Sequence, residues 1–295
     1  MSSFQHVCLL GFGEVGQALA ADFQAAGVTQ LTAFDLLFKN SESACTRAAV
    51  DAKVRVAGSA AEAVAAADLI VCAVTAAQDL AAAQSVAGAM QSGAYFLDVN
   101  SVSPGVRARA AELIDGSGAR YVEAAIMSPI HPKRVGSPML FGGQHAAEFL
   151  PLAQALGFSG AEVFSEQIGR ASAAKMCRSV MIKGMEALLT ESLLSARHYG
   201  VESTVMQSLR NLFPAADWST LARYMISRSL IHGRRRAEEM REVARTVSEA
   251  GLDPHMSAAC AQRQDWAAGS RDAASIEDLN EMLDAVLSRA KAEKV

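Results

Sequence analysis

Two hydrophobic patterns divide the chain into a first and a second part. Up to about residue 164, short apolar runs of strand type alternate with alanine-rich stretches whose apolar residues recur at helical spacing. The strand-like runs are residues 7–10, 31–34, 54–57, 69–74, 95–99, 121–127, 139–141 and 162–164. Helices fit between many of them, for example at 80–90 and 106–114. This alternation predicts a mostly parallel sheet with helices on both faces.

The pattern changes after Gly169. Residues 171–199 contain no proline and one glycine, and their apolar positions follow a helical period. A single helix of that length spans about 43 Å at ~1.5 Å per residue. The later stretches 221–231, 237–250 and 276–291 are also helical in pattern. We therefore predict an α/β, Rossmann-type, doubly wound domain over 1–165 and an all-helical domain for substrate binding and dimerisation over 166–295.

The first strand-like run leads directly into Gly11-Phe12-Gly13-Glu14-Val15-Gly16, and a helical pattern follows. On a strand-to-helix turn, Gly11 permits the tight bend, Gly13 lets the backbone approach a pyrophosphate, and Gly16 lets helix and strand pack closely. We assign the whole turn, with Phe12, Glu14 and Val15, to a dinucleotide cofactor. The alternative is a packing turn without a ligand.

Asp35 closes the next apolar run, 35 − 16 = 19 residues after Gly16. This is near the ~20 residues expected for a carboxylate that binds the ribose diol of NAD, and a carboxylate there repels the 2′-phosphate of NADP. We therefore expect NAD, while the nearby Lys39 and Arg47 keep NADP possible. Val74, Thr75 and Asn100 are also assigned to the cofactor site.

The overall composition gives no indication of nucleic-acid binding, a metal site or a membrane span. The net charge of −4 provides no basic field for nucleic acid. The five cysteines show no disulfide or zinc spacing, and the histidines and carboxylates form no metal motif, so we expect no metal. A secretory leader and a membrane-spanning apolar run are not expected, which makes the cytoplasm the default location.

Three segments, in this order and spacing, resemble the β-hydroxyacid dehydrogenase family, which includes 3-hydroxyisobutyrate and 6-phosphogluconate dehydrogenases and is related to imine reductases. They are residues 10–27 with the glycine turn, 98–104 (DVNSVSP) and 168–179 (IGRASAAKMCRS). The resemblance implies that Asn100 and Ser101 lie beside the nicotinamide and the substrate. It also implies that Lys175 is the catalytic lysine, and that Ser179 replaces a substrate-binding asparagine.

Chemistry also supports Lys175 as the catalytic lysine, independently of the resemblance. Oxidation of an alcohol by hydride transfer needs a proton acceptor near the hydroxyl, and a lysine whose pKa is lowered by burial serves near neutral pH. Its place directly after the last strand predicts a site where the two domains meet. The alternative is a solvated lysine. Ser179 and Lys183 follow at steps of four and share its helix face, where Lys183 is either a second cation for an acidic substrate or a surface charge.

Two regions depart from the family pattern where a substrate would bind. In 121–143, the segment that corresponds to a glycine-containing substrate loop, Met127-Ser128-Pro129 replaces Ser-Gly-Gly. We expect a different anionic or polar group to be held there, and His131 to be either a ligand or a plain loop residue. The residues that we assign to this group are Ser128, His131, Lys133 and Arg134.

In the last domain, the cluster 234–236 (RRR) stands before the position of a family lysine that this chain lacks. We expect Arg235 and Arg236 either to bind a substrate carboxylate or phosphate bidentately, or to pair with the neighbouring glutamates 238, 239 and 242. This segment looks like a divergent branch of the family with a phosphogluconate-dehydrogenase-like last domain.

Together these observations predict an NAD-dependent oxidoreductase that transfers hydride between nicotinamide and a 3-hydroxyacid-like alcohol. Lys175 is the general acid–base, and Ser101 and Ser179 orient the hydroxyl. The alternatives are an imine reductase-like enzyme and a catalytically silent NAD-binding protein. We expect the substrate to be small and anionic, and the protein to be a homodimer or a higher even oligomer.

Overall fold

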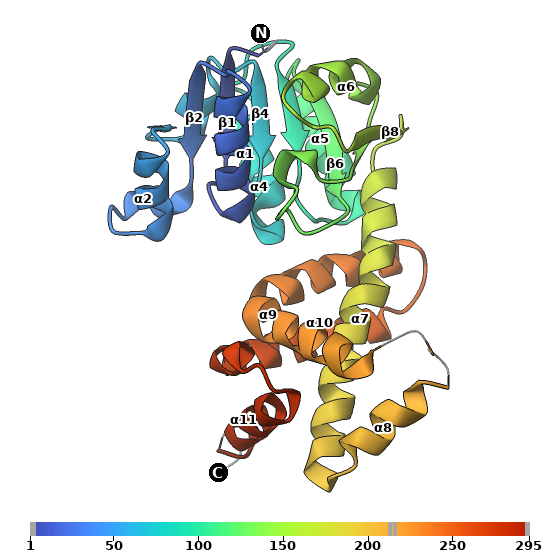
Figure 1. The fold of residues 1–295 in the computed structure, drawn as a ribbon. Coiled ribbons are helices and arrows are strands. Elements are labelled where there is room, and N and C mark those ends of the chain that lie inside the picture. Colours follow the sequence, from blue (N-terminus) through green and yellow to red (C-terminus); the bar gives the residue numbers. More distant parts are fainter. Residues whose placement is uncertain (1–3, 212–213, 215–216, 293–295) are drawn as a thin grey trace. The chain divides into compact units, whose positions relative to one another are not determined.

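The computed structural model describes residues 4–211, 214 and 217–292, and the chain divides into two compact units between residues 176 and 177 (Figure 1). The first unit contains all the strands of the described residues and the second contains helices only. The predicted fold class, a Rossmann-type unit followed by a helical one, is confirmed. The division lies within a long helix, later than the boundary at 165 that the sequence predicted.

The described residues of the first unit form one eight-stranded sheet. The strands are β1 (His6–Leu10), β2 (Gln30–Phe34), β3 (Arg55–Val56), β4 (Leu69–Cys72), β5 (Tyr95–Asp98), β6 (Arg120–Ile126), β7 (Met139–Gly142) and β8 (Ala161–Ser165). Their order is β3-β2-β1-β4-β5-β6-β7-β8, and only the pair β6–β7 is antiparallel. The first six strands thus follow the order of a dinucleotide-binding fold.

Helices cover both faces of this sheet. The helices are α1 (Glu14–Ala25), α2 (Ala44–Asp51) and α6 (Ala146–Ala155) on one face, and α3 (Ala60–Val64), α4 (Asp79–Val86) and α5 (Pro104–Gly116) on the other. Successive strand residues point to opposite cores: Leu9 packs with the first set and Cys8 with the second. Because both faces of the central strands are buried, most of their positions are apolar, which explains the apolar runs in the sequence.

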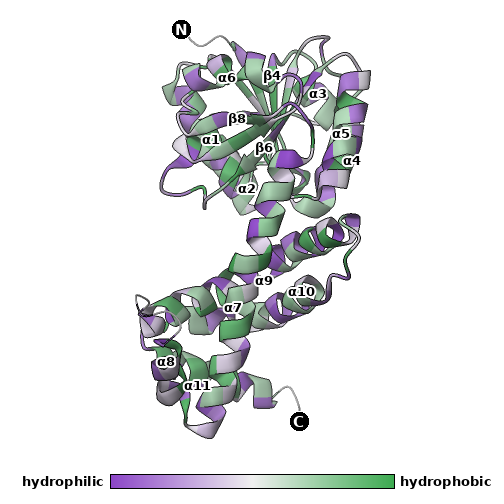
Figure 2. Cartoon of the chain, turned by 90° about the vertical axis from the view of Figure 1, so that its right-hand side faces the viewer, coloured by the Kyte–Doolittle hydropathy of each residue, from purple (hydrophilic) through white to green (hydrophobic). Residues whose placement is uncertain are grey.

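The second unit is built around long amphipathic helices, along which hydrophobic and hydrophilic residues alternate (Figure 2). The helices are α7 (Arg170–Tyr199), which begins in the first unit, then α8 (Glu202–Leu209), α9 (Trp218–Glu249), α10 (His255–Ala267) and α11 (Leu279–Ala292). Leu193 of α7, Leu230 of α9 and Leu283 of α11 share one buried core. None of the described helices combines the length and the hydrophobicity that a bilayer span needs.

Helix α9 is continuous where the sequence predicted two helices. Gly233 lies in the middle of it, and a side chain at this position would collide with the backbone oxygen of Gln264 in α10. The glycine therefore does not end the helix; it lets α9 and α10 pack closely.

Candidate functional site

The turn between β1 and α1 has the shape of a phosphate-binding loop. Gly11 has a φ of +91°, and a side chain on it would collide with the backbone oxygen of Ala73. A side chain on Gly16 would collide with the oxygen of Gly11. At Gly13, the N-cap of α1, a Cβ would meet nothing within 4 Å, and no side chain caps this helix start among the described residues. The first amides of α1 are thus accessible to a pyrophosphate, as the sequence argument requires.

Both carboxylate oxygens of Asp35 accept backbone hydrogen bonds, one of them from this turn. Oδ2 accepts a hydrogen bond from the backbone N–H of Phe12 at 2.8 Å, and Oδ1 accepts one from Leu37 at 2.9 Å. Asp35 directly follows β2, whose parallel pairing with β1 brings the ends of the two strands together. The spacing in the sequence therefore corresponds to a direct contact between the half-buried Asp35 carboxylate and the turn, and its assignment to a ribose stays a prediction.

The other predicted cofactor residues lie at the same edge of the sheet. Val74 and Thr75 follow β4, which pairs with β1 on the side opposite β2. The backbone nitrogen of Val74 is 3.0 Å from the point where a Cβ on Gly11 would stand. Val15 and Val74 are half-buried, whereas Glu14 and Thr75 are exposed. The structure therefore gathers the predicted cofactor residues of β1, β2 and β4 around one turn.

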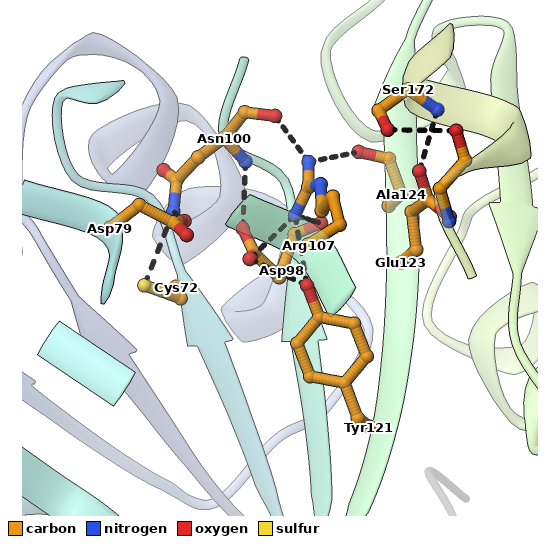
Figure 3. Close-up of polar contacts among 10 residues, drawn as sticks. Cys72, Asp79, Asp98, Asn100, Arg107, Tyr121, Glu123, Ala124 and Ser172 are labelled. Carbon is orange, nitrogen blue, oxygen red and sulfur yellow. Dashed lines mark hydrogen bonds and ion pairs between the residues drawn. The ribbon is translucent and has the colours of Figure 1, made fainter. Parts of the chain in front are cut away.

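A buried arginine joins β5 to β6 (Figure 3). Nη1 of Arg107, from α5, lies 2.5 Å from Oδ2 of Asp98 and donates a hydrogen bond to the Asp98 carbonyl at 3.0 Å. Nη2 donates to the carbonyl of Asn100 and, at 3.4 Å, to that of Ala124. The Tyr121 hydroxyl donates to Asp98 at 2.8 Å. One cation thus fixes the end of β5, the loop after it and the neighbouring strand.

Two carboxyl groups in this cluster titrate in opposite directions. Burial, and then the charge of Asp98, raise the pKa of Asp79 to about 8. Burial also opposes ionisation of Asp98, but the neighbouring Arg107 guanidinium holds the pKa of Asp98 below its ordinary value. At neutral pH, therefore, Asp79 is mostly protonated and Asp98 is ionised.

The same cluster has the spacing, but not the chemistry, of a metal site. Ligand atoms of Cys72, Asp79 and Asp98 lie within 4.8 Å of one another. The Asn100 side-chain amide, however, donates to Oδ1 of Asp79 at 2.6 Å and to Sγ of Cys72 at 3.3 Å. Arg107 neutralises Asp98, and burial raises the pKa of the Cys72 thiol. The Asn100 amide and the Arg107 charge thus take up acceptors that a bound cation would need.

The loop after β5 carries two predicted site residues, Asn100 and Ser101. The buried side chain of Asn100 points into the cluster with Asp79, which gives it a structural role, and its role toward a cofactor stays a prediction. Ser101 is half-buried and follows the carbonyl that Arg107 binds. The backbone position of Ser101 is therefore fixed by a cation on the next helix.

Lys175 is half-buried in the second turn of α7. The helix follows Gly169, whose φ is +92°. The buried carboxylate of Glu123, on β6, accepts hydrogen bonds from the backbone N–H groups of Gly169 at 2.8 Å and Ser172 at 2.5 Å (Figure 3). The segment before Lys175 is thus bonded to the sheet.

The loop after β6 is attached to α1 by Arg134. Nη2 of Arg134 lies 2.8 Å from Oδ1 of Asp22 and donates to the Ala18 carbonyl at 3.0 Å, while Oδ2 of Asp22 accepts from the N–H of Val135. Arg134 therefore has partners on α1, and the four-residue polar group that the sequence suggested is not assembled as such.

Ser128, His131 and Lys133 remain in this loop. Ser128 is half-buried and its Oγ donates to the Pro129 carbonyl at 3.0 Å, whereas His131 and Lys133 are exposed. Their assignment to a substrate stays a prediction.

Predicted substrate residues in the second unit take part in ion pairs. Lys183 lies 2.5 Å from Glu239, and Arg235 lies 3.2 Å from another oxygen of Glu239. Arg236, which is buried, pairs with the buried Glu186 of α7. These contacts favour the pairing alternative for the arginines, and the partner of Arg236 is a glutamate that the sequence argument did not consider.

Ser179, one turn after Lys175 on α7, is buried. Its assignment as a residue that orients the substrate hydroxyl stays a prediction.

The comparisons with known proteins agree with this architecture. The NAD-binding domain of 6-phosphogluconate dehydrogenase matches residues 6–169, which is more than half of the chain. The chain belongs to the β-hydroxyacid dehydrogenase family. A domain of unknown function (DUF1932) matches residues 196–267, within the helical unit.

Solved structures of similar chains match nearly the whole length of this chain. A conserved hypothetical protein from Sinorhizobium meliloti is 33% identical, covers 98% of each chain and has a TM-score of 0.73. The 3-hydroxyisobutyrate dehydrogenase of Mycobacterium tuberculosis, solved with L-serine, is 18% identical over 98% of this chain and 99% of its own, with a TM-score of 0.69. An imine reductase from Myxococcus stipitatus, in complex with NADP+, is 18% identical over 96% and 99%, with a TM-score of 0.54. At such identity the last two share the fold alone.

Four residues of the site were not assigned a role from the sequence: Arg107, Tyr121, Asp79 and Glu123. The sequence contains a weak indication that Arg107 is buried, since it shares a helix face with Val106, Ala110 and Ile114, which are all buried. A charged residue among buried positions is usually paired, so this arginine predicts a buried acid. The sequence does not indicate which one.

Proposed function

We propose that the protein is an NAD-dependent oxidoreductase that transfers hydride between nicotinamide and a 3-hydroxyacid-like alcohol, with Lys175 as the general acid–base. The observation that carries the proposal is a half-buried lysine in the second turn of a helix whose first amides are bonded to the sheet of a dinucleotide-binding unit. A rigid helix is a suitable support for a proton-transfer group, since small displacements of such groups cost large factors in rate.

In the oxidative direction, the neutral amine of Lys175 accepts the hydroxyl proton of the substrate as the carbinol C–H bond breaks and the C–O bond becomes a carbonyl. NAD, when bound, supplies the hydride acceptor at nicotinamide C4. Ser101 and Ser179 are proposed to hydrogen-bond the substrate oxygen and so to keep it in line with the amine. In reduction, the ammonium of Lys175 returns the proton.

NAD is preferred over NADP in this proposal because the Asp35 carboxylate, held by two backbone amides, repels a 2′-phosphate. Lys39 and Arg47 are exposed, and Arg47 already donates to the carbonyl of Glu42.

For the substrate, we propose a small anionic molecule whose polar end meets Ser128 and His131. Lys183, Arg235 and Arg236 would bind that anion only by leaving their glutamate partners. The reaction is proposed to occur in the cytoplasm, where the five cysteines, all free thiols, stay reduced.

We also propose a homodimer or a higher even oligomer. Met181 and Leu188 on α7, and Tyr224 and Ile231 on α9, are exposed large hydrophobic residues spaced seven apart, so each pair shares a helix face. Light scattering of the full chain measures the assembly. Leu188→Glu and Ile231→Glu together are expected to give monomers, and an already monomeric native chain contradicts this part of the proposal.

The activity is tested with NAD+ and a panel of 3-hydroxyacids that includes 3-hydroxyisobutyrate and L-serine, by following NADH absorbance. Lys175→Ala is expected to lower turnover at least about a hundredfold. The control Lys291→Ala changes an exposed lysine of α11 and is expected to leave turnover unchanged. Near-native turnover by Lys175→Ala would refute the lysine mechanism.

Two other functions give different results in the same experiment. An imine reductase-like enzyme, favoured by the fold shared with the Myxococcus stipitatus protein, would consume reduced cofactor with cyclic imines and leave the hydroxyacids unoxidised. A silent NAD-binding protein, favoured by the loss of the glycines at Met127-Ser128-Pro129, would bind NAD without turnover on either panel.

A further inference from the structure

Glu123 is a completely buried carboxylate in the middle of the sheet, on β6 between β5 and β7. It is bonded to a helix that is remote in sequence: Oε2 accepts from the N–H of Gly169 at 2.8 Å, and Oε1 accepts from the N–H of Ser172 at 2.5 Å. These are amides at the start of α7. A strand residue therefore caps a helix that begins some fifty positions later in the chain.

The sheet makes room for this side chain at Gly142. Gly142 pairs with Glu123 across β6 and β7, and a Cβ on it would stand 2.7 Å from Oε2 of Glu123. The carboxylate cannot easily move away, because both of its oxygens are already hydrogen-bonded. The lack of a side chain at Gly142 thus leaves space for the carboxylate; it is not required by a turn.

The first turn of a helix has amides without partners inside the helix and carries a partial positive charge, so a carboxylate stabilises it. Caps usually come from the residue just before the helix. Here, the cap comes from a strand that Arg107 also holds, through the carbonyl of Ala124. The position of the helix start is therefore set by the sheet.

We propose that Glu123 is a positioning residue for Lys175. By accepting hydrogen bonds from the amides of Gly169 and Ser172, it fixes the first turn of α7, and with it the position of the following turn, which carries the lysine amine. Lys175 follows Ser172 by three residues and so belongs to the next turn of the same helix. The inference rests on the proposed function, because it gives Lys175 the proton transfer that requires a fixed position.

The main variant is Glu123→Gln, which keeps the shape but turns one accepting oxygen into an N–H donor that faces a backbone amide. The matched control is Glu162→Gln, an exposed glutamate on β8. Hydrogen exchange of the full chain, read over residues 166–176, is expected to be about tenfold faster in Glu123→Gln and unchanged in the control. Exchange in the glycine turn 11–16 is expected to stay at the native rate.

Turnover then tests whether Glu123 acts through Lys175. On the best 3-hydroxyacid of the panel, Glu123→Gln is expected to lower kcat about tenfold while the Kd for NAD changes less than about twofold. In the Lys175→Ala background, the same change is expected to have no further effect on kcat. Losses that multiply in the double variant would show that Glu123 acts by another route, and would overturn the proposal.

A second pair of variants keeps the test decisive if Glu123→Gln folds poorly. Gly142→Ala leaves Glu123 in place but displaces its carboxylate, and is expected to speed exchange over 166–176 as Glu123→Gln does. In a Glu123→Ala background, Gly142→Ala meets no carboxylate and is expected to have no such effect. Native hydrogen exchange over residues 166–176 in both Glu123→Gln and Gly142→Ala overturns the inference. Native turnover in Lys175→Ala refutes only the proposed function. In that case hydrogen exchange still tests whether Glu123 caps the helix.

Discussion

Arg107 and Asp98 form an ion pair inside the first unit, with Nη1 2.5 Å from Oδ2 and each side chain no more than 1% exposed. The other groups to which the guanidinium donates are also internal: the backbone carbonyls of Asp98, Asn100 and Ala124, and the hydroxyl of Tyr121. A charge pair so deep in a protein depends on both partners, because either one alone would be a buried, unpaired charge.

Arg107→Met is therefore expected to lower the free energy of unfolding by about 3–5 kcal/mol, the cost of stranding one partner of a buried pair. Urea denaturation measures this loss. Arg109→Met, an exposed position on the same helix, is expected to change stability by less than about 0.5 kcal/mol. The double variant Arg107→Met, Asp98→Asn should lose less than the sum of the two single changes, and simple additivity would contradict the pairing.

Asp79 is expected to make stability fall as pH rises. Its carboxyl keeps a proton up to about pH 8 in the folded chain and loses it near 3.8 in the unfolded chain. Between these values the folded state binds more protons, so the contribution decreases with pH, by at most about 1.4 kcal/mol per pH unit, and levels off above about pH 8.

Asp79→Asn mimics the protonated acid and should remove this contribution. The difference in unfolding free energy between the variant and the native chain, measured by urea at pH 5, 6.5 and 8, is expected to grow with pH in favour of the variant. Asp272→Asn, on an exposed aspartate of the second unit, provides the control. A difference that is constant over this range would mean that Asp79 is ionised in the folded chain throughout.

We expect Asp35 to determine the preference for NAD over NADP. Asp35→Arg and Asp35→Ser should shift the ratio of kcat/KM values toward NADP, because the charge that repels a 2′-phosphate is removed. Steady-state rates with NAD+ and NADP+ on the same substrate provide the measurement. A native enzyme that already prefers NADP strongly would disprove the electrostatic argument.

Substitutions of two arginines of α9 distinguish a role in structural ion pairing from a role in substrate binding. Arg236 is buried against Glu186, whereas about half of the Arg235 side chain is exposed. Arg236→Met is expected to destabilise the protein by about 3 kcal/mol, and Arg235→Met by less than about 1 kcal/mol. If the pairing is their role, KM for the substrate stays within about twofold in both; a tenfold rise in KM with native stability would instead support substrate binding.

Periodicity was sufficient to predict most of the fold. Each of the eight predicted strand runs overlaps a strand, because strands buried on both faces are mostly apolar. The predicted break at 232–236 was wrong for a physical reason: glycine and arginine are poor indicators of a helix end when the glycine serves close packing against α10 and one arginine finds a buried partner.

The site was predictable where chemistry depends on short spacing, and hidden where it depends on contacts remote in sequence. The contact of Asp35 with the glycine turn followed from one number, the separation along a βαβ unit. The bonds from Glu123 to Gly169 and Ser172, and from Arg107 to Asp98, depend on which strand lies beside which helix, and no local pattern encodes them.

The hydrogen bonds of Asp35 have a consequence for attempts to redesign this protein for another nucleotide. The group that selects the nucleotide also shapes the loop that receives it, since it holds the N–H of Phe12 on one side and that of Leu37 on the other. Any replacement without two acceptors loses at least one of these hydrogen bonds, and loss of the bond from Phe12 loosens the entry to α1. A substitution of Asp35 that alters nucleotide specificity therefore also weakens the loop, unless a neighbouring side chain is changed at the same time to accept the hydrogen bonds that the aspartate accepted.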